Sequence, residues 1–238
     1  MIVAATQFAP AAGDVEANVR SVAELIRAAG ADGARVIVFA ELVLSGYEPS
    51  LVRDTPGIVL TEDDPRLEPV REACRAARVA AVVNGPVRTA DGRPGITTLV
   101  VGPDGGLLAR YDKRHLHGIE RDVFAAGTED GRFTVDGVRF ALTTCYDNRF
   151  PELAARAAAD GCRACLASSV VSVGSDAFEE VYPVRARDFG LYMVLGNVLG
   201  RNEDGAGGGH AGGWGPDGTR IADAGDAGPA YVLMEIPA

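Results

Sequence analysis

Residues 138–167, VRFALTTCYDNRFPELAARAAADGCRACLA, contain a strand, a helix and a second strand in succession. Val138 to Thr143 is an apolar run of strand length, and it ends just before Cys145. Pro151 stands at a first helical position and begins the helix. Ala164 to Ala167 forms the second strand. The segment predicts an α/β fold in which a cysteine follows the end of a buried strand.

The same alternation continues on both sides of this segment. Apolar residues from Val15 to Ala29 recur at spacings of three and four, which predicts a helix with Asp14 as its N-cap and Gly30 as its stop. Val36 to Phe39 reads as a strand buried on both faces. The other predicted elements are helices at Pro65–Cys74 and Ala177–Phe189, and strands at Ile2–Phe8, Val79–Val83, Thr97–Val101, Leu107–Tyr111, Phe133–Val135, Leu191–Gly196 and Tyr231–Ile236.

Two hairpins are interspersed among these units. Pro103-Asp104-Gly105-Gly106 is a turn sequence between two strand-like runs, and Asp136-Gly137 is another. A purely parallel doubly wound sheet and a barrel of eight equal units both fit this order poorly. The order predicts a layered α/β sandwich with mixed sheets. Because no linker or change of composition divides the chain, we expect one domain over residues 1–238.

Charge and composition exclude several classes of partner. The chain has 238 residues, of which 47% are hydrophobic, and 33 Asp and Glu against 23 Lys and Arg give a formal net charge of −10. Such a molecule repels phosphate backbones and anionic lipid head groups, so we expect neither nucleic acid nor a membrane as a partner. Met1 to Phe8 is apolar but follows no basic region, unlike a secretory signal. We therefore expect a cytoplasmic protein.

Three side chains with acid–base chemistry follow the ends of predicted strands. They are Glu41, Lys113 and Cys145, at the positions where α/β folds usually assemble their sites. A thiol nucleophile needs a base to accept its proton and a cation or amide donors to hold an oxyanion, and these residues supply both. Spacing alone leaves a second interpretation open, in which Cys145 is an inert buried thiol and the two charges lie on a rim.

The segments around these residues carry a family resemblance. They are FAELVLSGY (Phe39–Tyr47), YDKRHLHGIERDVFAAG (Tyr111–Gly127) and CYDNRFPEL (Cys145–Leu153). In this order they resemble the three diagnostic segments of the nitrilase superfamily of carbon–nitrogen hydrolases, and the third is similar to its amidase-like branches. The resemblance implies a four-layer αββα sandwich of two mixed β-sheets flanked by helices. It also implies a homodimer or larger assembly and a small-molecule amide as substrate.

The resemblance further implies a role for each matching residue. Glu41 is expected to be the general base, Lys113 the cation that stabilises the oxyanion, and Cys145 the nucleophile that forms a thioester. Glu120 is expected to position the lysine and the substrate, and the backbone N–H of Tyr146 to complete the oxyanion hole. No cofactor and no metal is implied.

Four further residues are candidates for the substrate pocket. Asn148 is selected by its closeness to Cys145 in sequence, while Tyr47, His210 and Trp214 are selected as aromatic or polar side chains in or near the motifs. His210 lies in the glycine-rich segment 207–212, which we expect to form a mobile loop over the site.

Other functions remain as alternatives at this point. An N-carbamoyl hydrolase or a nitrilase would use the same three residues. A metal hydrolase could use His115, His117 and His210, the three histidines of the chain. A catalytically inactive protein of the same fold would bind a small molecule and release no ammonia.

Overall fold

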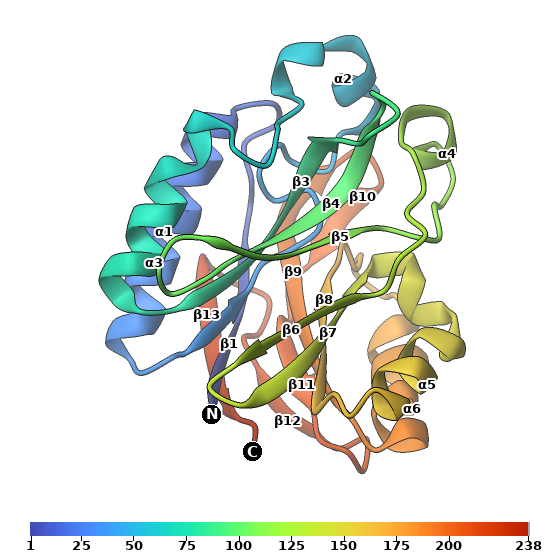
Figure 1. The fold of residues 1–238 in the computed structure, drawn as a ribbon. Coiled ribbons are helices and arrows are strands. Elements are labelled where there is room, and N and C mark those ends of the chain that lie inside the picture. The colour runs from blue at the N-terminus through green and yellow to red at the C-terminus, as the bar shows by residue number, and fades with distance from the viewer. Residues whose placement is uncertain (238) are drawn as a thin grey trace.

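The computed structural model describes residues 1–237, which form helices and strands in alternation (Figure 1). The helices are α1 (Val15–Ala31), α2 (Pro49–Asp54), α3 (Glu68–Ala77), α4 (Glu120–Val123), α5 (Pro151–Ala159) and α6 (Tyr182–Phe189). The strands are β1 (Ile2–Phe8), β2 (Val36–Val38), β3 (Ala80–Arg88), β4 (Pro94–Val101), β5 (Leu107–Asp112), β6 (Gly131–Val135), β7 (Val138–Thr144), β8 (Ala164–Ser168), β9 (Tyr192–Asn202), β10 (Gly205–Gly208), β11 (Gly212–Trp214), β12 (Arg220–Asp223) and β13 (Ala230–Glu235).

The strands form two mixed halves that share one hydrogen-bonded path, in the order β5-β4-β3-β2-β1-β9-β8-β7-β6. In the first half β1, β2 and β3 are parallel, while β4, β5 and β13 are antiparallel to their neighbours. In the second half β7, β8 and β9 are parallel, and β6, β11 and β12 complete it. A short parallel pairing of Gln7 and Phe8 in β1 with Asn197 and Val198 in β9 joins the halves.

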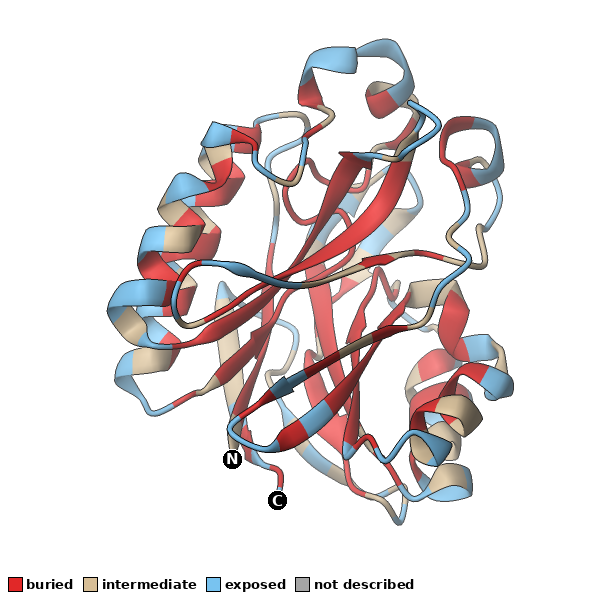
Figure 2. Cartoon of the chain, in the orientation of Figure 1, coloured by how far each residue is buried: buried red, intermediate tan, exposed pale blue. Residues whose placement is uncertain are grey.

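The halves pack face to face with helices outside, so the layers run helix, sheet, sheet, helix. In Figure 1 α1 and α3 cover one half, and α5 and α6 cover the other. The residues between the two sheets are apolar and buried, among them Val36, Phe140, Leu166 and Val194. Figure 2 shows the central strands largely buried, the edge strand β5 partly exposed, and the helices exposed along their outer faces. The predicted αββα sandwich is confirmed.

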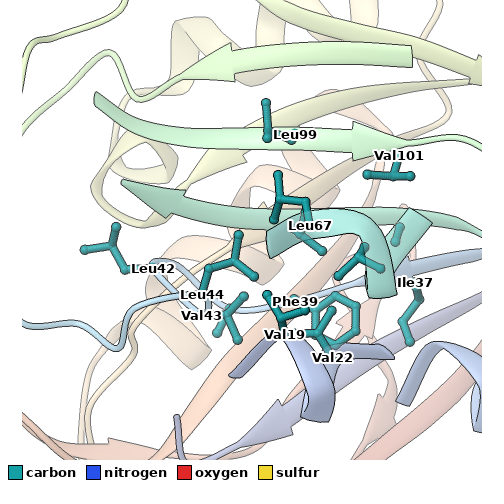
Figure 3. Close-up of a cluster of buried hydrophobic side chains, with 14 of the residues drawn as sticks. Val19, Val22, Ile37, Phe39, Leu42, Val43, Leu44, Leu67, Leu99 and Val101 are labelled. Atoms are coloured by element: carbon teal, nitrogen blue, oxygen red, sulfur yellow. The ribbon is translucent and has the colours of Figure 1, made fainter. Parts of the chain in front are cut away.

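Helix α1 shows how the apolar spacing produces the outer layer. Asp14 caps it as predicted, because its side chain accepts a hydrogen bond from Ala17 N. Val19 and Val22 lie against Ile37 and Phe39 in the cluster shown in Figure 3. Gly30 does not stop the helix, which continues to Ala31.

Close packing of α1 against α3 explains why residue 30 is a glycine. A Cβ atom at this position would lie 2.7 Å from the Cβ of Ala77 and 2.9 Å from a methyl carbon of Val79. Glycine therefore allows α1 to approach α3 closely, at the cost of a weaker helix-forming tendency.

Two other expectations need correction. Residues 207–212 are not a free loop, because β10 and β11 both pair with β9. The helix expected over residues 177–189 begins with a π-helical turn, Ala177–Val181, before α6. Such wide turns place side chains differently from an α-helix and often occur beside functional sites. Within the described residues, no helix combines the length and the apolar character that crossing a bilayer requires.

Candidate active site

Four of the predicted site residues converge: Glu41, Lys113 and Cys145 follow β2, β5 and β7, and Glu120 begins α4. Lys113 Nζ donates hydrogen bonds to Glu41 Oε1 at 2.7 Å and to Glu120 Oε1 at 2.8 Å. All three of these side chains are fully buried. Cys145 lies near enough to influence the pKa values of both Glu41 and Lys113. One ammonium group thus joins two carboxylates beside a thiol, with bulk water excluded from the ion pairs.

The local backbone explains how Glu41 and Lys113 reach this place. After β2 the chain leaves the sheet, and Leu42, with φ of +49°, donates its N–H to Asn84 Oδ1 at 2.7 Å. This left-handed residue turns the chain directly after Glu41. Lys113 follows β5, where its N–H donates to Ile96 O at 2.9 Å and its carbonyl accepts from Gly127 N–H at 2.8 Å. Both side chains are therefore held by backbone bonds on either side.

Cys145 begins a 3-10 turn, Cys145–Arg149, that we call the cysteine turn. Its φ of +46° lies in the left-handed region, where a residue with a side chain is strained. The surrounding contacts maintain this conformation. Asn148 Nδ2 donates to Cys145 O at 3.0 Å, and Arg185 of α6 donates from Nε to Asn148 O at 2.9 Å. The Sγ atom points toward Val170 O at 3.6 Å.

Burial and neighbouring charges together set the pKa values of the site. It raises the pKa of the Glu41 carboxyl to about 7, against the attraction of Lys113. Burial and the charge of Glu41 also raise the pKa of the Cys145 thiol well above its usual range. For Lys113 burial lowers the pKa, but the charges of Glu41, Cys145 and Glu120 outweigh it and the net shift is upward. The resting site therefore holds a thiol, an ammonium group and a carboxyl that titrates near neutrality.

Glu41 has one free acceptor atom. Within residues 1–237 its Oε2 is buried and accepts no hydrogen bond, whereas Oε1 is bonded to Lys113. A buried carboxylate oxygen without a partner is costly and often marks a functional group. Here it leaves one oxygen available for a proton from the thiol or from a ligand.

A cavity of about 170 Å³ opens at Cys145. Tyr47, Glu120 and Tyr146 line it, as the motifs predict, and Tyr47 donates its hydroxyl to Glu120 Oε1 at 2.7 Å. The remaining wall is partly apolar and partly polar. Its apolar residues are Val170, Val171, Ala177, Val181 and Tyr182, and its polar ones are His117, Arg149, Ser175 and Asp204.

Three predicted pocket residues do not line this cavity. Asn148 points into the protein, where it holds the carbonyl of Cys145. Trp214 is buried behind the wall and stacks on Tyr182, with ring centroids 5.2 Å apart. His210 pairs with Asp223 at 2.9 Å on the outer side. The structure thus places these three residues outside the lining of this cavity, because closeness in sequence and aromatic character do not fix the direction of a side chain.

Two features of the sequence could have identified some of the cavity-lining residues that were not predicted. A 3-10 turn has three residues per turn, so Tyr146 and Arg149 share a face while the residues between them point elsewhere. Val170 and Val171 follow the end of β8, which is the same rule that selected Glu41 and Cys145. Asp204 lies between β9 and β10, and no sequence signal indicated it.

The three histidines make separate contacts and do not meet at one site. His115 Nδ1 lies 2.9 Å from Asp147 Oδ1, His117 donates its backbone N–H to Glu120 Oε2 at 2.8 Å, and His210 pairs with Asp223. Among residues 1–237 no group of three His, Cys, Asp or Glu side chains is arranged to hold a metal ion. The arrangement gives no support to the alternative of a histidine-bound metal.

Comparison with protein families and curated proteins gives consistent matches. Residues 2–238 match the family described as carbon-nitrogen hydrolase. A protein of Pseudomonas protegens named "Hydrolase in pqqF 5'region" is 31% identical over 229 residues, which cover 94% of this chain and 79% of that protein. The human omega-amidase NIT2 is 31% identical over 160 residues, which cover 61% of this chain and 55% of that enzyme.

Solved structures show the same architecture. A mutant of the amidase from Nesterenkonia sp. AN1 in complex with butyramide matches with a TM-score of 0.91 and 24% identity, covering 100% of this chain and 91% of that one. A second structure of that amidase, after Michael addition of acrylamide at its active-site cysteine, has the same TM-score and identity and is covered to 93%. At this level of identity the likeness establishes the fold.

Proposed function

Since the chain belongs to the carbon–nitrogen hydrolase family, we propose that it is an amidase that cleaves the non-peptide C–N bond of a small amide. The reaction would pass through a thioester on Cys145 and release ammonia or an amine. One observation carries the proposal above all: fully buried Lys113 lies between Glu41 and Glu120 beside a cavity that opens at a thiol.

In the first half-reaction the sulfur of Cys145 attacks the amide carbonyl carbon while its proton passes to Glu41. The thiol needs this base because its raised pKa keeps it protonated at rest. Lys113 and the N–H of Tyr146 hold the tetrahedral oxyanion. Glu41 then returns the proton to the nitrogen, and the C–N bond breaks to leave a thioester.

In the second half-reaction a water molecule attacks the thioester carbon and gives a proton to Glu41. The C–S bond breaks, the acid departs, and the proton returns to the sulfur of Cys145. Glu120 serves as a positioning residue, since it accepts hydrogen bonds from Lys113, from Tyr47 and from the backbone of His117. It thereby fixes the direction in which Lys113 presents its charge.

The size of the cavity favours a small acyl group. A volume of about 170 Å³ with a wall of valine and alanine side chains suits a short chain rather than a peptide. Ammonia release from a panel of amides, N-carbamoyl compounds and nitriles of increasing acyl length tests the proposal. Release from no member of the panel would favour the inactive binding protein.

We expect the kcat/KM of amide hydrolysis to rise with pH below about 7 and to level off above it. Glu41 acts as a base only when it has lost its proton, and the pKa of its carboxyl is about 7. The measurement is kcat/KM from about pH 5 to about pH 9 for the wild type and for Glu41→Gln. The variant should be about 10²- to 10⁴-fold slower, and its kcat/KM should no longer rise with pH. A flat wild-type profile across neutrality would contradict the assigned base.

We expect an amide to be preferred over the nitrile that bears the same acyl group. An amide oxygen becomes an oxyanion that Lys113 and the N–H of Tyr146 stabilise directly, whereas the nitrile nitrogen must be protonated. The residues after the nucleophile, Tyr146-Asp147, also resemble amidase-like branches. Matched amide and nitrile pairs, compared by kcat/KM, provide the test. A consistent preference for nitriles would make the protein a nitrilase with the same three residues.

A further inference from the structure

Asp147, in the middle of the cysteine turn, has no part in the reaction described above and is fully buried. Its Oδ2 accepts hydrogen bonds from Tyr111 Oη at 2.6 Å and from Thr144 N–H at 3.1 Å. Its Oδ1 accepts from His115 N–H at 2.9 Å and lies 2.9 Å from His115 Nδ1. Both carboxylate oxygens are thus satisfied without an Arg or Lys side chain.

These partners flank the reacting residues. Tyr111 and His115 stand two residues before and two after Lys113, and Thr144 immediately precedes Cys145. The carboxylate therefore joins the segment that carries the ammonium group to the turn that carries the thiol. The ring of His115 also stacks on Phe150, with centroids 3.7 Å apart and an interplanar angle of 11°.

No other hydrogen bond makes this connection. Within residues 1–237, every hydrogen bond between residues 111–115 and the cysteine turn ends on the carboxylate of Asp147. Cys145 is held in a left-handed conformation, which persists only when its surroundings determine it fully. The Asp147 carboxylate is therefore the hydrogen-bonded link between the cysteine turn and the segment that carries Lys113.

We propose that Asp147 is a positioning residue that aligns the Cys145 thiol with Lys113. The inference rests on the proposed thiol amidase function. The four polar groups around Asp147 require an acceptor at both oxygens, because Thr144 and His115 present backbone N–H groups to different ones. An asparagine has nearly the same shape but turns an NH₂ group toward one of these donors. Asp147→Asn therefore breaks the connection with little change in volume.

The first test is the kinetics of Asp147→Asn with a short aliphatic amide such as butyramide. We expect kcat to fall about 100-fold and KM to change little, since displacement of reacting groups by about 1 Å is enough for such a loss. We also expect alkylation of Cys145 by iodoacetamide to slow by about tenfold or more, because the thiol loses its alignment with Lys113 and Glu41. Alkylation needs no turnover, so it reports on the thiol by itself.

Gln7→Met is the matched control. Gln7 is also fully buried and makes three hydrogen bonds, to Gly225 O, Ala227 O and Ala211 N, but none to the site. This variant should lose stability while keeping kcat and the alkylation rate per folded molecule. An equal loss of kcat in both variants would assign Asp147 a general structural role and overturn the proposal.

Tyr111→Phe decides the question if Asp147→Asn does not fold. It removes one hydroxyl from Asp147 and leaves the other three polar groups in place. We expect a loss in kcat of about tenfold, the usual size for one buried hydrogen bond to a charged group, at an unchanged KM. Wild-type kcat and alkylation in this variant would overturn the proposal.

If the wild-type protein hydrolyses no amide, the proposed function is refuted. The alkylation rates would still test whether Asp147 aligns the thiol.

Discussion

Replacing Cys145 by alanine should abolish amide hydrolysis and leave the fold intact. Loss of the nucleophile removes the covalent route, and removal of such a residue costs about 10⁴-fold or more in turnover. The substitution is small and introduces no new strain, because alanine and cysteine bear the same Cβ at a φ of +46°. Ammonia release and circular dichroism on the same preparation measure both effects. Activity at about a tenth of the wild-type level would refute the assignment of the nucleophile.

Cys74→Ala is the matched control for this prediction. It makes the same chemical change at a thiol that is buried in the core beside α1, away from the cavity. We expect this variant to lose some stability and to keep its activity per folded molecule. Iodoacetamide should inactivate the wild type, and chelators should have no effect. The reverse pair of results would favour the histidine-based metal hydrolase.

Replacing Lys113 by alanine should have the second largest effect, on turnover and on stability together. Turnover should fall by about 10³-fold, because the main cation facing the oxyanion is gone. Stability should fall by about 3–5 kcal/mol, since Glu41 and Glu120 are left buried without a counter-charge. Initial rates and denaturant unfolding provide the two measurements.

An exposed ion pair supplies the comparison for Lys113. Arg53 and Asp54 form a contact of 2.8 Å in which both side chains are more than half exposed. Arg53→Ala should change stability by less than about 1 kcal/mol and leave turnover unchanged. If Lys113→Ala changed stability and turnover as little as Arg53→Ala, Glu41 and Glu120 would be taking up protons or water at no cost. That result would contradict the proposed role of the Lys113 cation.

The sequence was sufficient to locate the residues at the strand ends. Glu41 and Cys145 each follow an apolar run that identifies a buried strand, and Lys113 follows the strand-like run of β5, which is partly exposed. Strands β2, β5 and β7 are not adjacent in the sheet order, so the strand ends located these residues but did not by themselves predict that they meet. The layered fold was predictable from the same kind of pattern. The spacing of apolar residues along a helix or strand indicates which of its faces is buried, and most helices and strands of this protein follow that spacing.

The wall of the cavity was not predictable in this way. Tyr182 and Trp214 are both buried aromatics, yet only Tyr182 reaches the cavity, because a π-helical turn precedes it and Trp214 lies one layer behind. Such placements depend on how β9, β11 and α6 pack together, and local sequence does not record that packing. Strands β10 and β11 escaped prediction because their glycine-rich segments lack the apolar alternation that reveals a strand, and β12 escaped it because its four residues are too few to show an alternation.

The pairing of β1 has a consequence for the order in which the protein folds. Strand β1 precedes its partners β9 and β13 along the chain by a long interval, and Ile2 pairs with Glu235. On the ribosome β1 has one unpaired edge until nearly the whole chain has emerged, and an open strand edge invites pairing with other chains. Contacts of such long range also slow the search for the native state. The edge of β1 is therefore completed only when residues 230–235 pair beside it.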